Sequence, residues 1–180
     1  MSFPQNVRNR EADVSAAHAV WIPTKQEKNA LLNRSQIDQL GQIDHMWHWL
    51  AEKYPGLIAV NAPHAFHPET FSYSELAKLI DWAAAGFSQL GLKRGEVVSL
   101  FAENSPRWLI ADQGLMRIGV SDAVRGAASP RDELQYILED SNSVGLIIQN
   151  SAVWAKLALT NDLRRQLKVV VQLEGIPSED

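Results

Sequence analysis

The sequence predicts an α/β fold in which helices flank a parallel, doubly wound sheet. Short apolar runs alternate with amphipathic helical stretches from residue 97 to residue 173. Serine followed by proline opens two of the helical stretches, at residues 105–106 and 129–130. The run Val169–Val171 is typical of a strand buried in a parallel sheet. Together these patterns favour strands and helices in strict alternation.

The most strongly patterned stretch is residues 97–143. Val97–Phe101 is a short apolar run that predicts a strand. The helix that follows starts at Ser105 and Pro106, and Gly119 suits a left-handed residue at its end. Its predicted buried face is Trp108, Ala111, Leu115 and Ile118. A second strand is expected over Val120–Arg125, and Ser129 and Pro130 are expected to open a helix that buries Leu134, Ile137 and Leu138.

The stretches on either side complete the expected elements. Before residue 97 we expect a helix over 42–54, short strands over 57–61 and 70–71, and a capping box made by Ser72 and Glu75. The box opens a helix whose apolar stripe is Leu76, Leu79, Ile80, Ala83, Phe87 and Leu90. After residue 143 we expect strands over 144–148 and 167–173, with helical segments over 153–159 and 162–166 between them. Residues 1–41 lack sustained periodicity and are expected to form a polar arm before an α/β subdomain over 42–180.

Composition limits the classes of function. The 180 residues are 46% hydrophobic and 21% charged, and the net charge of −4 disfavours nucleic acid as a partner. The chain has no cysteine, which excludes disulfides and thiolate chemistry. We expect a cytoplasmic protein, because no apolar run approaches the roughly 20 residues that span a bilayer and the N-terminus lacks an apolar signal core. Peripheral membrane contact stays open.

Several separated motifs carry a family resemblance. They are Glu103–Trp108, Ala111-Asp112, Arg117–Gly119 and Glu133–Ser141, together with Thr70–Leu76. Over residues 43–150 the chain resembles the N-terminal part of the AMP-forming acyl-activating enzymes, the group of long-chain acyl-CoA and acyl-ACP synthetases. Most relatives have Val-Pro-Leu where this chain has Ala123–Gly126, and this variant is more similar to the cyanobacterial and plastid acyl-ACP synthetases.

The resemblance implies an activity for a longer protein. Such ligases join a fatty acid to ATP with Mg²⁺, release pyrophosphate, and pass the acyl group to the thiol of acyl-carrier protein or CoA. It also implies that this chain is an incomplete N-terminal subdomain of the adenylate-forming fold, cut before the phosphate-binding loop. The Ser/Thr/Gly-rich loop with its lysine, the ribose-binding aspartate and the C-terminal lysine of the family are absent from the sequence. We therefore expect no catalytic, cofactor-binding or metal-binding residue here, and an inactive 180-residue chain.

Arg125 and Gly126 are the candidate substrate-binding residues. A parallel sheet binds ligands at the carboxyl ends of its strands, where Arg125 is expected, and Gly126 permits close backbone approach. The alternative for Arg125, which the residues favour, is a salt bridge to a neighbouring carboxylate. His45 and His48 have a spacing compatible with a metal, and His64 and His67 lie in one loop. No third ligand is evident in either case, so surface histidines are the preferred interpretation.

Two classes of function remain at this stage. In the first, the chain is the scaffold of a fatty-acid ligase and supplies one wall of the acyl site. In the second, it is a non-catalytic α/β interaction module or the product of a truncated frame. The absence of a phosphate loop keeps the second class open, and the coding sequence beyond Asp180 would discriminate between them.

Overall fold

The computed structural model describes residues 24–25, 40–64 and 68–175. The chain divides between Gln39 and Leu40, and the part that begins at Leu40 is described below. The predicted polar arm over residues 1–41 falls largely outside the described residues. It stays a prediction, as does the role of His67.

Four parallel strands form the central sheet in the order β4-β3-β5-β6. They are β3 (Val97–Phe101), β4 (Ser121–Arg125), β5 (Gly145–Ile148) and β6 (Val169–Gln172). Each strand lies within one or two residues of the predicted run. The order places β4 and β5 on either side of β3, so the chain reverses its winding direction after β4. This confirms the predicted parallel, doubly wound sheet.

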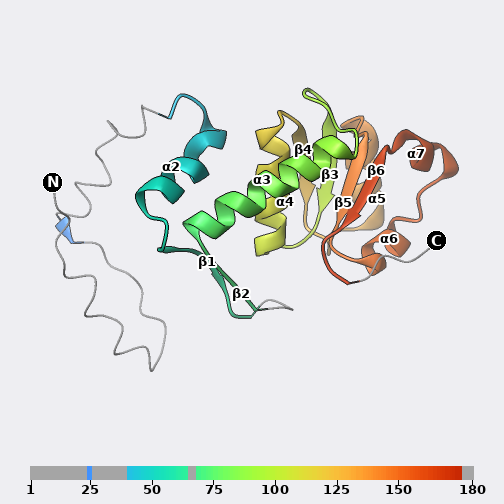
Figure 1. Cartoon of the computed structure of the whole chain (residues 1–180). Helices are drawn as coiled ribbons and strands as arrows, with labels where there is room; N and C mark the ends of the chain where they lie inside the picture. Colours follow the sequence, from blue (N-terminus) through green and yellow to red (C-terminus); the bar gives the residue numbers. More distant parts are fainter. Residues whose placement is uncertain (1–23, 26–39, 65–67, 176–180) are drawn as a thin grey trace. The chain divides into compact units, whose positions relative to one another are not determined.

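Helices cover both faces of the sheet (Figure 1). On one face lie α3 (Tyr73–Gln89) and α4 (Pro106–Arg117), which pack closely against each other. On the other face lie α5 (Arg131–Asp140), α6 (Ser151–Leu157) and α7 (Asn161–Gln166). This placement follows from right-handed crossovers taken in opposite directions along the sheet.

Two apolar clusters form the core, one on each face of the sheet. The cluster under α3 and α4 contains Phe87, Leu92, Val98, Leu100, Ala102, Ala111, Leu115, Val120 and Ile147. The cluster under α5, α6 and α7 contains Phe101, Leu134, Leu138, Leu146, Ile148, Val153, Leu157, Leu159 and Leu163. Strand β3 supplies residues to both, because successive side chains of a strand point to opposite faces.

The segments before α3 stand apart from the sheet. A short 3₁₀ turn, η3 (Ile43–His45), leads into α2 (Met46–Lys53), so the predicted helix over 42–54 is split in two. Strands β1 (Ile58–Ala62) and β2 (Glu69–Ser72) pair antiparallel as a separate two-stranded sheet. Alternation of strands and helices thus predicts the doubly wound sheet only from β3 onward.

Two predicted helix starts are confirmed atom by atom. The Glu75 backbone N–H donates to Ser72 Oγ (3.3 Å), and the Ser72 N–H donates to Glu75 Oε2 (2.8 Å), which completes the capping box. Hydrogen bonds from the backbone and hydroxyl of Ser72 lower the pKa of Glu75. At α4, Ser105 Oγ accepts the Trp108 N–H (3.1 Å), with Pro106 as the first helical residue.

The predicted start of α5 at Ser129 is wrong by one residue. Pro130 is the N-cap, with no side-chain cap, and the helix begins at Arg131. Ser129 instead closes a turn through its backbone, because its N–H donates to the Gly126 carbonyl (3.1 Å) and its own carbonyl accepts Lys156 Nζ. A serine before a proline can therefore either cap a helix or close a turn. Here the contact of the Ser129 carbonyl with Lys156 of α6 favours the turn.

Two predicted buried positions are exposed. Leu90 follows the last residue of α3 and is 52% exposed. Val170 in β6 is 42% exposed, because β6 is the last strand on its side of the described sheet. Periodicity identifies the apolar face of an element but not how far its neighbours extend over that face.

Replacing the two capping serines by alanine tests the helix starts. Ser72→Ala and Ser105→Ala should each lower the free energy of unfolding by roughly 0.5–2 kcal/mol, since an orphan N–H loses its acceptor. Urea unfolding of the purified chain measures this loss. Ser129→Ala is the matched control and should leave the midpoint unchanged, because α5 has no side-chain cap. A loss at Ser129 equal to that at Ser105 would contradict the assigned helix starts.

Gly114 allows α3 and α4 to approach closely. A Cβ at this buried position would lie 2.8 Å from Ala83 Cβ and 3.2 Å from the Ala84 backbone N. Gly86 in α3 is also helical, but a Cβ there would meet no atom within 4 Å. Substituting alanine at each glycine therefore separates the effect of helix propensity on stability from the effect of packing.

Opposite stability changes are expected at the two glycines. Gly86→Ala should stabilise by up to about 1 kcal/mol through helix propensity. Gly114→Ala should destabilise by roughly 1–3 kcal/mol, because overpacking against the α3 backbone outweighs the same propensity gain. Thermal or urea unfolding checks both. Stabilisation by Gly114→Ala would mean that the α3–α4 contact is looser than described.

Candidate functional site

The candidate site is the carboxyl edge of the parallel sheet, where open α/β sheets bind ligands. Strands β3, β4, β5 and β6 end there at Phe101, Arg125, Ile148 and Gln172. The residues that follow the four strand ends are therefore brought to one edge. They come from stretches separated by more than 20 positions in the chain.

Glu103 connects the ends of three strands. Its carboxylate oxygen Oε1 accepts the Ala128 N–H (3.1 Å) from the loop after β4. Its own backbone N–H donates to Gln149 Oε1 (3.2 Å), beyond the end of β5. Glu103 is an exposed residue, so these contacts lie at the surface of the edge.

Gln149 continues this line of polar contacts to β6. Its Nε2 donates to Glu174 Oε2 (3.3 Å), and its carbonyl accepts the Glu174 N–H (2.8 Å). The four strand ends are thus joined by side chains as well as by the backbone ladder. The sequence analysis missed Glu103, Gln149 and Glu174; their places one or two residues after a predicted strand end are the signal that could have found them.

Gly126, one of the two predicted substrate-binding residues, faces Glu103. A Cβ at Gly126 would lie 3.1 Å from Glu103 Oε1, which is tighter than an ordinary contact. The predicted close approach to Gly126 is therefore made by a carboxylate of the same chain. A role for Gly126 in binding substrate stays a prediction.

Arg125, the other predicted residue, forms an ion pair with Glu133 on α5. Its Nε and an Nη both lie 2.6 Å from Glu133 Oε1. The contact agrees with the salt-bridge interpretation that the sequence favours. The side chain of Arg125 is still 50% exposed, so one side of the guanidinium faces solvent. Substrate binding by Arg125 stays a prediction.

Lys156 fixes the loop that follows Gly126. From α6, its Nζ donates to the carbonyl of Ala127 (2.9 Å) and to that of Ser129. The ammonium group is thereby directed at backbone oxygens of the loop. A lysine near a sheet edge suggests phosphate binding, but here its hydrogen bonds hold the β4–α5 connection in place.

The charges at this edge do not favour phosphate groups. Glu103 and Glu174 contribute two negative charges and Lys156 one positive charge, which is directed at backbone carbonyls, while Arg125 is paired with Glu133. Phosphate sites in proteins use inward-pointing amides and cations. Among the residues the structure describes, no group of three or more His, Cys, Asp and Glu side chains could hold a metal ion. The edge is suited to holding strands and loops together.

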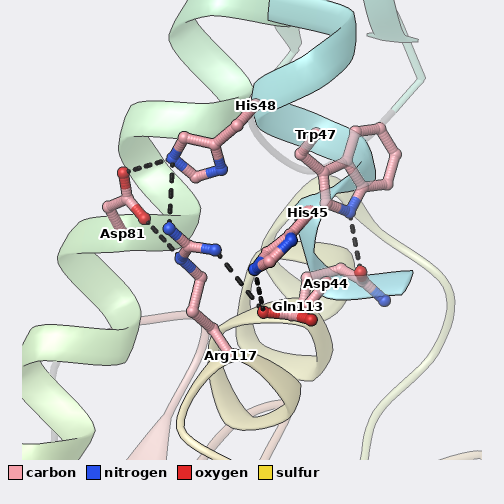
Figure 2. Close-up of polar contacts among 7 residues, drawn as sticks. All are labelled: Asp44, His45, Trp47, His48, Asp81, Gln113 and Arg117. Carbon is pink, nitrogen blue, oxygen red and sulfur yellow. Dashed lines mark hydrogen bonds and ion pairs between the residues drawn. The ribbon is translucent and has the colours of Figure 1, made fainter. Parts of the chain in front are cut away.

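A second polar cluster lies between η3, α2, α3 and α4 (Figure 2). Arg117, the last residue of α4, contacts Asp81 of α3 (Nε–Oδ1 2.8 Å) and Asp44 of η3 (Nη1–Oδ2 3.5 Å). His48 of α2 contacts the other oxygen of Asp81 (Nε2–Oδ2 2.8 Å). His48 therefore connects α2 to α3. The neighbouring His45 has its Nε2 atom 3.8 Å from Asp44 Oδ2.

The AMP-binding enzyme family matches residues 47–180 of the chain. Two relatives from Arabidopsis thaliana are similar over 133 residues: probable acyl-activating enzyme 16, chloroplastic, at 36% identity, and long-chain-fatty-acid–[acyl-carrier-protein] ligase AEE15, chloroplastic, at 34%. Each alignment covers 74% of this chain and 18% of the relative. The human long-chain-fatty-acid–CoA ligase ACSBG1 is 28% identical over 182 residues, which cover 99% of this chain and 25% of that protein. The chain therefore spans between 18% and 25% of the length of these relatives.

Solved structures share the fold. The N-terminal domain of FACL13 from Mycobacterium tuberculosis, in an inhibitor-bound crystal structure, superposes with a TM-score of 0.66 at 21% identity. The match covers 72% of this chain and 33% of that chain. A Mycobacterium tuberculosis fatty acyl CoA synthetase gives a TM-score of 0.67 at 21% identity, over 75% of this chain and 27% of that chain.

Neutralising either partner of the Arg125–Glu133 pair tests how much this ion pair contributes to the stability of the fold. Arg125→Gln and Glu133→Gln should each lower the free energy of unfolding by at most about 1 kcal/mol, because water screens an exposed pair. The double variant should cost no more than either single one, since both singles remove the same contact. Urea unfolding of the three variants measures this. Additive losses would show that Arg125 and Glu133 stabilise the fold independently.

Proposed function

Because this chain belongs to the AMP-binding enzyme family, we propose that it is the scaffold of the opening α/β subdomain of a long-chain fatty-acid ligase. The subdomain begins near residue 42, after the polar N-terminal segment. The observation that carries the proposal is the alignment of 133 residues, at 34% identity, with a long-chain fatty-acid ligase for acyl-carrier protein. The alignment with a CoA ligase extends over 99% of the chain.

The reaction proposed for the longer protein has two steps. A fatty-acid carboxylate attacks the α-phosphate of ATP, and the bond to the departing pyrophosphate breaks to leave an acyl-adenylate. A thiol of acyl-carrier protein or CoA then attacks the acyl carbonyl, and AMP leaves. Both steps develop charge on phosphate oxygens, which Mg²⁺ and preorganised donors stabilise.

The scaffold role follows from what the carboxyl edge offers. Its carboxylates and amides are engaged with one another, and Lys156 is directed at backbone carbonyls. Cations free to bind phosphate, and a small-residue loop with a lysine, would have to come from elsewhere in the polypeptide. We propose that this chain supplies the rigid sheet on which those parts are assembled, with Arg125 and Gly126 at the wall of the acyl or carrier site.

The acceptor and the location are proposed from the sequence. The segment Ala123–Gly126 resembles the acyl-ACP synthetases, so we propose acyl-carrier protein as the preferred acceptor over CoA. Among the described residues, no helix is long and apolar enough to cross a membrane. A cytoplasmic location, with or without peripheral membrane contact, stays a prediction.

Fatty-acid-dependent exchange of pyrophosphate into ATP tests the activity. The 180-residue chain should exchange at background, because its sequence has no Ser/Thr/Gly-rich phosphate-binding loop followed by a lysine. The same chain extended by the coding sequence that follows it should exchange, and chelation of Mg²⁺ should abolish that signal. Exchange by the 180-residue chain would overturn the scaffold role.

The extended protein also discriminates between a ligase and a non-catalytic protein. If the extended protein binds neither ATP nor fatty acid, this would favour the non-catalytic interaction module or the product of a truncated frame. If exchange is present, transfer to holo-acyl-carrier protein should have a higher kcat/KM than transfer to CoA. The opposite preference would overturn the choice of acceptor while leaving the ligase activity intact.

A further inference from the structure

The loop between β4 and α5, residues 126–130, is held by side chains from two other parts of the chain. From the residues that follow β3, Glu103 Oε1 accepts the Ala128 N–H (3.1 Å). From α6, Lys156 Nζ donates to the carbonyl of Ala127 (2.9 Å) and to that of Ser129. Three consecutive residues of the loop are therefore each bonded to a side chain that lies outside it.

These contacts fix the place of the loop, whereas its own turn fixes only its shape. The turn is closed by the Ser129 N–H, which donates to the Gly126 carbonyl (3.1 Å). A local hydrogen bond of this kind moves with the loop, because donor and acceptor belong to the same short segment. Glu103 and Lys156 instead anchor the loop to the end of β3 and to α6.

Glu103 is the anchor that lies against Gly126. A Cβ at Gly126 would lie 3.1 Å from Glu103 Oε1 and 3.5 Å from Oε2, so both oxygens face the backbone there. The Glu103 backbone is itself fixed, since its N–H donates to Gln149 Oε1 (3.2 Å) beyond the end of β5. One carboxylate therefore determines how closely the loop after β4 approaches the end of β3.

The surface formed by this loop suits a polar group more than an acyl chain. Glu103 and Ala128 are exposed, and the side chain of Arg125 is 50% exposed. An acyl chain needs a wall of buried apolar side chains, because its stabilisation comes from removing apolar surface from water. The thiol arm of an acceptor carries amides and approaches the acyl-adenylate from solvent. An exposed wall with a guanidinium group offers such an arm hydrogen bonds.

We propose that Glu103 is a positioning residue for the thiol acceptor: it holds residues 126–128, and with them the neighbouring Arg125, in the conformation that binds the acceptor's thiol arm. Lys156 holds the same loop from the side of α6. The inference rests on the proposed ligase function, and it assigns the loop after β4 to the second step of the reaction rather than the first. Glu103 acts in this role only through the loop.

The two steps of the reaction should respond differently to loss of the Glu103 carboxylate. Acyl-adenylate formation does not involve the acceptor, so exchange of pyrophosphate into ATP should be retained. Transfer to the thiol should weaken through the KM of the acceptor, because a displaced loop binds the arm less well. A general loss of folded protein would instead reduce both steps in parallel.

The contact itself is tested in the 180-residue chain by amide hydrogen exchange at Ala128. Glu103→Ala should speed exchange of this N–H by at least about fivefold, since the amide loses its acceptor. Glu103→Gln keeps a side-chain oxygen at the same position and should restore most of the protection. Glu139→Ala, at an exposed glutamate of α5, is the matched control and should exchange like the wild type. Equal exchange at Ala128 in the wild type and in Glu103→Ala would overturn the positioning role.

The acceptor role is tested in the chain extended by the coding sequence that follows it. Glu103→Ala should lower kcat/KM for the acceptor about tenfold or more, mainly through KM, while pyrophosphate exchange stays within about twofold of the wild type. Glu103→Gln should recover most of the loss, and Glu139→Ala should have no effect. Holo-acyl-carrier protein and CoA should be affected equally, because both present the same thiol arm. Parallel losses of exchange and transfer, or a loss confined to one acceptor, would overturn the proposal.

A second variant keeps the inference testable if Glu103→Ala folds poorly. Lys156→Met removes the anchor on the other side of the loop and should raise the KM of the acceptor in the same way. Unchanged acceptor kinetics in Lys156→Met would overturn the anchoring from two sides. If the extended wild-type protein shows no pyrophosphate exchange, the proposed ligase function fails, and hydrogen exchange at Ala128 still decides whether Glu103 positions the loop.

Discussion

The structure depends on the central position of β3 in the parallel ladder. Its alternating side chains point into two separate apolar clusters, with Val98 and Leu100 on one face and Phe101 on the other. Each cluster needs helices over its own face of the sheet, so α4 and α5 must cover opposite faces. The backbone pairing of β3 with both β4 and β5 makes this arrangement obligatory, because each crossover must return parallel.

The same topology explains why the carboxyl edge is cohesive rather than open. Strands from four parts of the chain end there, and their following residues must satisfy backbone groups that the ladder leaves unpaired. Glu103, Gln149 and Glu174 do this across neighbouring strands, while Lys156 satisfies carbonyls of the β4–α5 loop. The polar groups of this edge are therefore satisfied largely by one another. The proposed scaffold role rests on this internal satisfaction of polar groups.

Polar groups on the α3–α4 face are arranged differently. Arg117 joins two acidic residues from two elements, so its charge is balanced by its neighbours. Burial, followed by the neighbouring Asp112, raises the pKa of Asp122 to about 7. Gln113 donates to Asp112 and accepts the indole N–H of Trp47, so it connects α4 to α2 through hydrogen bonds.

The amino-acid sequence by itself determined the features that depend on residues within a few positions of each other. The Ser72–Glu75 box, the Ser105 cap and the left-handed Gly119 can be predicted locally because their partners are three residues away. Each strand of the sheet can be predicted from its own apolar run. Only the tertiary structure decided that Ser129 closes a turn and that its carbonyl accepts Lys156 Nζ from α6. It also decided that Glu103 accepts from Ala128, 25 positions away. These contacts depend on helix phase, strand register and crossover direction together, and no local pattern encodes all three.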